Sequence, residues 1–192
     1  MTGVQTCALP IWAQLPDGSE ATVIAWIWAR TVTCPNPACG IEMPLVRSWW
    51  LGKKKGKEAY IVPTVVGDHI EYSIGHDPKE APTKENDGTI SGRRGAVCLA
   101  CGTPVSMKYI KTEGNAHRMN ATLLAMACDA HRTRAYVPPA CPHINMTLMD
   151  RPDDVPSQAL PDDPRNFWTV PYGLDTFDKL FTNNLADRKS VV

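Results

Sequence analysis

Four cysteines form two pairs in this chain, and a glycine directly follows each pair. Cys34 and Cys39 are separated by four residues and precede Gly40, whereas Cys98 and Cys101 are separated by two and precede Gly102. Thiolate pairs on tight turns are the ligands of tetrahedral Zn²⁺ sites with four sulfurs. The long stretch between the pairs does not oppose such a site, because closure entropy rises slowly with loop length.

This pattern predicts a structural metal site. A tetrahedral centre with four thiolates has no open position for water, so it stabilises a fold rather than performing hydrolysis. The predicted fold class is mainly β, a small zinc-ribbon-type β domain with long loops and an extended Pro-rich C-terminal segment. Two alternatives remain for the four cysteines: disulfides, or free thiols in a core.

Other sequence features carry weaker chemical signals. Cys128, Cys141 and His143 form a second group, but no matching ligand pair accompanies the Cys-Pro-His segment, and these residues stay unassigned. The chain has no glycine-rich nucleotide loop, no recognised nucleophile elbow and no paired-carboxylate signature. The sequence therefore identifies no catalytic residue and no residue that binds an organic cofactor.

The elements expected to position the cysteines are mostly strands. Residues 21–32 are rich in β-branched and aromatic side chains and predict a strand with Val23, Ala25, Ile27 and Ala29 on one face, with a helix as the alternative. Gly67-Asp68 predicts a hairpin turn. Further strands are expected at 43–51, 59–66, 69–74, 104–111, 122–128 and 134–137, a loop at 52–58, a flexible loop at 75–92, and short helices at 141–149 and from 176 to 185; residues 96–101 bring in the second cysteine pair.

The two ends differ in character from the rest of the chain. Residues 1–11 and 187–192 match what common short-read sequencing adapters encode, so we expect both segments to be adapter-derived and not native; natural tails are the alternative. Between them we expect a zinc-ribbon β domain (12–111), a β-hairpin with a short helix (112–149), and an extended linker (150–186).

Bulk composition limits the possible partners and location. The 192 residues include 20 Lys and Arg against 20 Asp and Glu, so no strong global attraction to nucleic acid is expected. The chain has no apolar run of about 18 residues, which predicts no membrane span. Paired cysteines without a secretion signal indicate a reducing, cytoplasmic location.

Two groups of side chains are candidates for contacts with DNA. The basic group could meet phosphates, with solvated loop charge as the alternative. The aromatic group could stack on bases, although packing in a thin β core is the more common role. The basic residues are Lys53, Lys54, Lys55, Lys57, Arg93 and Arg94, and the aromatic ones are Trp26, Trp28, Trp49 and Trp50.

Several stretches resemble bacterial and archaeal adenine-specific DNA methylases that contain a zinc ribbon. The resemblance spans nearly all of residues 15–185. Its main motifs are Ile-Ala-Trp-Ile-Trp-Ala-Arg-Thr-Val at 24–32, Cys-Pro-Asn-Pro-Ala-Cys-Gly at 34–40, Met-Pro-Leu-Val-Arg at 43–47 and the segment 93–105 around the second cysteine pair. Shorter matches lie at 136–139, 160–165 and 172–174. In that family the ribbon is inserted within the methylase.

The resemblance implies a parent enzyme that flips adenine out of double-stranded DNA and methylates it from S-adenosylmethionine. The family's cofactor-binding glycine motif and its Asp-Pro-Pro-Tyr motif are both missing from this chain, so only Cys34, Cys39, Cys98 and Cys101 transfer, as zinc ligands. The chain alone is expected to be inactive. The alternatives are a standalone zinc-ribbon module that binds nucleic acid or a protein partner, and a purely structural zinc-stabilised subdomain.

Overall fold

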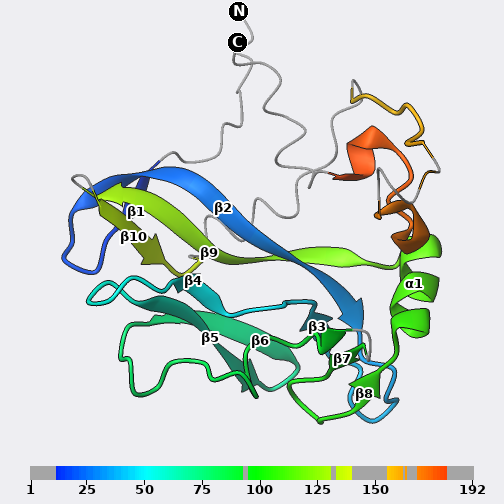
Figure 1. Cartoon of the computed structure of the whole chain (residues 1–192), viewed down its shortest axis with the longest axis horizontal. Helices are drawn as coiled ribbons and strands as arrows, with labels where there is room; N and C mark the ends of the chain where they lie inside the picture. Colours follow the sequence, from blue (N-terminus) through cyan, green and yellow to red (C-terminus); the bar gives the residue numbers. More distant parts are fainter. Residues whose placement is uncertain are drawn as a thin grey trace, which may run out of the picture.

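The protein is built mainly from antiparallel β-strands, as the sequence predicts. A computed structural model describes residues 12–92, 95–130, 133–139, 155–161, 163 and 168–180. Within these residues three sheets and one α-helix form, and the two larger sheets lie one above the other (Figure 1). No helix in these ranges is long and apolar enough to cross a membrane.

The largest sheet carries the longest strand of the described chain. Its strands are β1 (Trp12–Gln14), β2 (Glu20–Thr33), β3 (Glu42–Pro44), β9 (Asn120–Ala130) and β10 (Thr133–Val137). The order is β1-β2-β9-β10, and β3 pairs with β2. β1 and β3 occupy opposite ends of one edge of β2, while β9 pairs along its other edge. The β2–β9 pairing joins residues on both sides of the expected boundary at 111.

The strand expected at 21–32 is confirmed, and the helical alternative is wrong. The expectation that its four apolar residues share one face is also wrong. The register shifts between Val23 and Ala25, which leaves Ile24 as an extra residue. Such a bulge shifts the alternation of side chains by one residue, so the residues after it point to the opposite face of the sheet. Val23 therefore packs in one core cluster, Ile27 and Ala29 pack in another, and Ala25 is exposed.

The second sheet is a hairpin with one short additional strand. It contains β4 (Trp50–Gly52), β5 (Ala59–Val66) and β6 (His69–Gly75). Val66 pairs with His69, so the predicted two-residue turn is confirmed. Gly67 has a φ of +60°, a conformation that such hairpin turns require.

The single strand expected at 43–51 is divided between two sheets. β3 ends at Pro44 and β4 starts at Trp50, and the segment between them is held by side chains of a distant loop. The Thr89 hydroxyl accepts a hydrogen bond from the Val46 N–H at 2.9 Å, and the Asp87 carboxylate accepts one from the Trp49 N–H at 2.7 Å. These polar side chains satisfy backbone groups that would otherwise need a neighbouring strand.

The third sheet is a very short hairpin followed by a helix. β7 (Ala96–Val97) pairs with β8 (Pro104–Val105), and α1 spans Met107–Asn115. The prediction of a strand over 104–111 is therefore wrong beyond residue 105. The Ser106 side chain accepts a hydrogen bond from the Tyr109 N–H at 3.1 Å, an N-cap that starts the helix.

The described C-terminal residues form two 3₁₀ turns, η3 (Val170–Tyr172) and η4 (Phe177–Leu180). The first of them packs against α1. A Cβ added to Gly114 of α1 would lie 2.2 Å from the Tyr172 carbonyl oxygen, so only glycine permits this approach. Of the helix expected from 176 to 185, only a 3₁₀ turn is described. Residues 181–185 and the helix expected at 141–149 lie outside the described residues.

One core cluster lies between the two larger sheets. Trp49 is 3% exposed there and packs with Ile61 and Leu124. Trp26 and Trp28 are half-buried against a second cluster on the first sheet. These three tryptophans thus pack in the core, which is the role that the sequence favours. Trp50 stacks edge-on against Tyr60 of β5.

Candidate metal centre

The first cysteine pair lies in the loop that connects β2 to β3. The Cys34 N–H donates to the Ile41 carbonyl at 2.8 Å, which closes the base of this loop. At its tip the N–H groups of Cys39 and Gly40 both donate to the Asn36 carbonyl, at 2.9 and 3.0 Å. Gly40 has a φ of +61°, which explains the glycine after the second cysteine.

The second pair lies in the loop that connects β7 to β8 and has the same backbone design. The Cys98 N–H donates to the Thr103 carbonyl at 3.0 Å, and the Gly102 N–H donates to the Cys98 carbonyl at 2.9 Å. Gly102 has a φ of +70°. Both cysteine pairs are therefore presented at the ends of antiparallel hairpins, as the spacing and the glycines predict.

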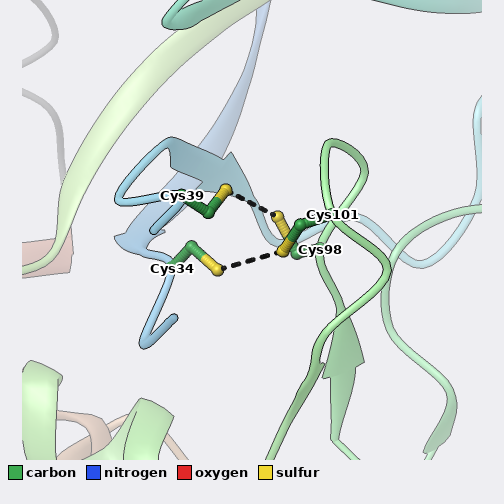
Figure 2. Close-up of side chains that lie close together, drawn as sticks. All are labelled: Cys34, Cys39, Cys98 and Cys101. Carbon is green, nitrogen blue, oxygen red and sulfur yellow. Dashed lines mark hydrogen bonds between the residues drawn. The ribbon is translucent and has the colours of Figure 1, made fainter. Parts of the chain in front are cut away.

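The four sulfurs converge on one point, as Figure 2 shows. The Cys34 and Cys101 Sγ atoms are 3.7 Å apart, the Cys39 and Cys98 Sγ atoms are 3.9 Å apart, and all four lie within 4.8 Å of one another. A tetrahedron with metal–sulfur bonds of about 2.3 Å has sulfur–sulfur edges of about 3.8 Å. The arrangement is thus compatible with one zinc ion.

The same distances exclude the disulfide alternative in this structure. A disulfide places its sulfurs about 2.05 Å apart, and the described cysteines are all free thiols. Cys128 is free as well, but it is fully buried in β9 within another cluster and does not join the four. Cys141 and His143 lie outside the described residues.

Burial differs sharply among the four ligands. Cys34 and Cys98 are 3% and 1% exposed and lie in a core cluster with Met43, Val105 and Ile110. The second cysteine of each loop is less buried: Cys39 is half-buried and Cys101 is exposed. The centre is consequently set at the rim of a core cluster, with one side open to solvent.

The electrostatics of the sulfurs suit a bound cation. Burial raises the pKa of the Cys34 thiol to about 12, so this sulfur favours its neutral form without a metal. The Thr103 hydroxyl and N–H lower the pKa of Cys101 to about 6. The Ile41 N–H lowers the pKa of Cys39, but burial and neighbouring sulfurs raise it overall. A divalent cation among four sulfurs would offset the desolvation of the thiolates.

Sequence reasoning missed three side chains that brace the site. The Tyr109 hydroxyl donates to the Thr33 carbonyl at 3.0 Å, which ties α1 to the residue before Cys34. The Asn36 amide donates to the Thr103 hydroxyl at 3.4 Å and so links the two loops. Asn36 and Thr103 could have been found from the sequence, because both lie in the cysteine loops. Tyr109 could not, because it falls in the segment 104–111 that the sequence predicts as a strand.

The predicted basic residues are not brought to the cysteines. The lysines occupy the loop between β4 and β5, which lies at the opposite end of the long axis from the cysteine loops (Figure 1). Lys53 places its Nζ 5.3 Å from the centre of the Trp50 ring, and the remaining lysines of this loop are exposed. Arg93 and Arg94 lie outside the described residues.

Comparisons with known proteins do not assign the chain to a family. No family model, curated protein or solved structure was found to match it.

Proposed function

We propose that Cys34, Cys39, Cys98 and Cys101 bind one structural Zn²⁺ ion in a zinc-ribbon-type centre. The observation that carries this proposal is the convergence of four sulfurs within 4.8 Å of one another from two hairpin loops. Four thiolates complete a tetrahedral shell, which leaves no position for a substrate or an activated water. The role of the ion is therefore to hold the fold together.

The local structure needs such a link. β7 and β8 contain two residues each, and isolated hairpins are at best marginally stable in water. The ion would fasten this hairpin to the loop that ends β2, the long strand of the largest sheet. Because a preformed site is absent from an unfolded chain, the free energy of binding becomes folding free energy.

The metal content of the purified chain tests this proposal. Purified under reducing conditions, the chain is expected to carry one zinc per molecule by elemental mass spectrometry. Single Ser replacements of Cys34, Cys39, Cys98 or Cys101 should lower that content. Cys128→Ser, which removes a buried thiol outside the site, should retain it. Equal zinc content in all five variants would show that the metal binds elsewhere.

For the wider function we propose the zinc-ribbon insertion region of an S-adenosylmethionine-dependent DNA adenine-N6 methyltransferase. The support is the sequence resemblance at residues 24–32, 34–40 and 93–105, together with the paired cysteine loops on which those motifs fall. In this proposal the region supports the fold of the parent enzyme or contacts its double-stranded DNA, and it contributes no catalytic group. A standalone zinc-ribbon module that binds nucleic acid or a protein is the alternative.

Sequencing the source DNA across both ends of the gene separates these proposals. The methyltransferase proposal predicts an open frame that continues to a glycine-rich cofactor motif and an Asp-Pro-Pro-Tyr motif. A frame bounded by natural start and stop codons at Met1 and Val192 would instead favour the standalone module.

The DNA-contact role can be tested by removing the lysine charges. Replacing Lys53, Lys54, Lys55 and Lys57 by Ala should weaken binding to duplex DNA and lower the salt slope by about 0.9 for each phosphate that the loop no longer neutralises. The matched control removes four exposed lysines elsewhere, Lys79, Lys84, Lys108 and Lys111. Equal affinity and equal slopes in the two variants would remove the special role of the loop and leave a structural subdomain.

A further inference from the structure

The four cysteines are unequal in their access to solvent. Cys101 is exposed, whereas Cys34 and Cys98 are 3% and 1% exposed. A small oxidant that diffuses from solvent therefore meets the Cys101 sulfur before it meets the two buried ones. Site-selective cysteine oxidation depends on this kind of exposure together with thiolate character, and a zinc ligand is a thiolate by definition.

Cys101 lies close to a sulfur of the other loop. Its Sγ lies 3.7 Å from the Sγ of Cys34, while Cys39 and Cys98 form the second close pair at 3.9 Å. Both of these close pairs connect the two loops, as Figure 2 shows. An oxidised Cys101 has a buried thiolate beside it that is shielded from the oxidant itself.

We propose that Cys101 is the site at which hydroperoxides oxidise this centre, and that Cys34 resolves the product as an inter-loop disulfide. This inference rests on the proposed zinc centre and goes beyond it by naming the reactive ligand and its partner. The Cys101 thiolate attacks the distal oxygen of a hydroperoxide, the O–O bond breaks, and an alkoxide leaves. Cys101 then carries a sulfenic acid.

The Cys34 thiolate completes the reaction by attacking the sulfenic sulfur. The S–O bond breaks, hydroxide leaves, and the Cys34–Cys101 disulfide forms. The two thiolates lose two electrons, the hydroperoxide gains them, and the alkoxide and hydroxide take protons from water. Only Cys39 and Cys98 then remain as ligands, too few for a tetrahedral site, so the metal is released.

The consequence of this pairing is that the covalent link replaces the metal link. Residues 34 and 101 belong to the same two hairpins that the ion would hold, so the oxidised chain keeps these loops joined after the zinc has left. A disulfide within one loop, such as one between Cys98 and Cys101, would leave the hairpins unconnected. The identity of the disulfide therefore decides between the two outcomes.

Disulfide mapping of the zinc-loaded chain tests the proposal. The experiment uses the full chain with Cys7→Ser and Cys141→Ser, because these thiols lie outside the described residues and would compete. The protein receives hydrogen peroxide below one equivalent and is then alkylated with N-ethylmaleimide. Trypsin leaves Cys34 and Cys39 in one peptide, so tandem mass spectrometry must locate the linked residue. Released zinc is followed with a chromogenic chelator.

The proposal predicts a dominant Cys34–Cys101 disulfide, alkylation of Cys39 and Cys98, and loss of one zinc for each disulfide formed. A dominant disulfide within one loop, or first oxidation at Cys39, would overturn it. If the purified chain carries no zinc, the proposed metal centre fails separately, and the same mapping on the metal-free chain still decides which pair forms. Cys128→Ser in the same background should leave the mapped pair unchanged.

Discussion

Two buried cysteines allow the contribution of the metal to be separated from that of ordinary packing. Cys98 is 1% exposed and belongs to the four-sulfur cluster, whereas Cys128 is 0% exposed and lies apart from it. Serine in place of either residue puts a hydroxyl into a buried site, which costs about 1–3 kcal/mol in proteins. Only Cys98→Ser also removes a zinc ligand.

The expected difference between the two variants is large. Structural zinc sites in small peptides contribute about 10–16 kcal/mol, which is comparable with the whole stability of a domain, about 5–15 kcal/mol. Cys98→Ser should therefore abolish the cooperative unfolding of the region around the hairpins. Cys128→Ser should lower the melting temperature by only about 2–12 °C, since each kcal/mol corresponds to about 2–4 °C in a domain of this size.

Thermal unfolding followed by circular dichroism, with and without a zinc chelator, measures this difference. The wild type and Cys128→Ser should both lose stability when the chelator is added, and Cys98→Ser should not respond to it. Equal melting of the two variants, or a wild type that is indifferent to the chelator, would refute the reasoning from metal binding to fold stability.

Two further predictions concern the supports of the centre. Gly95→Ala should destabilise the chain by more than about 2 kcal/mol in urea unfolding, because φ is +108° and the new Cβ would lie 2.1 Å from the Val105 carbonyl oxygen. The control Gly40→Ala, with open space around its Cβ, should cost about 1–2 kcal/mol. Equal losses of stability in the two variants would show that the steric clash at Gly95 does not matter. The Arg118 guanidinium lowers the pKa of Glu113, so the pair stabilises the fold above the ordinary carboxyl pKa and loses this effect as the pH falls through the lowered value. Glu113→Gln should accordingly lower the urea midpoint at pH 7 and have little effect in strong acid; a constant difference across this range would argue against the ion pair.

The parts of the fold that could be predicted are those that local chemistry determines. The cysteine spacing and the glycines that follow predicted both loops, because a positive φ after the second cysteine is a local requirement. The Gly67-Asp68 turn and the β-branched run of β2 were predicted for similar reasons. The hairpin of residues 122–128 and 134–137 appears as β9 and β10, which pair from Thr133 to Val137.

The parts that could not be predicted depend on distant residues. Nothing near residues 43–51 signals that Asp87 and Thr89 hold their backbone between two sheets. The bulge at Ile24 arises from the pairing with β9, where Val23 pairs with Cys128 and Ala25 with Ala127, and it turns Ile27 and Ala29 to the opposite face of the sheet. The helix α1 differs from these cases, because Ser106 is a recognisable N-cap residue and so gives a local signal for the start of a helix.

The most direct test of the metal centre is X-ray absorption spectroscopy at the zinc edge of the purified chain. The account predicts a first shell of four sulfurs at about 2.3 Å and no nitrogen or oxygen ligand. A shell that contains oxygen or nitrogen would contradict a closed site made by Cys34, Cys39, Cys98 and Cys101, and a chain that takes up no zinc under reducing conditions would contradict the centre itself.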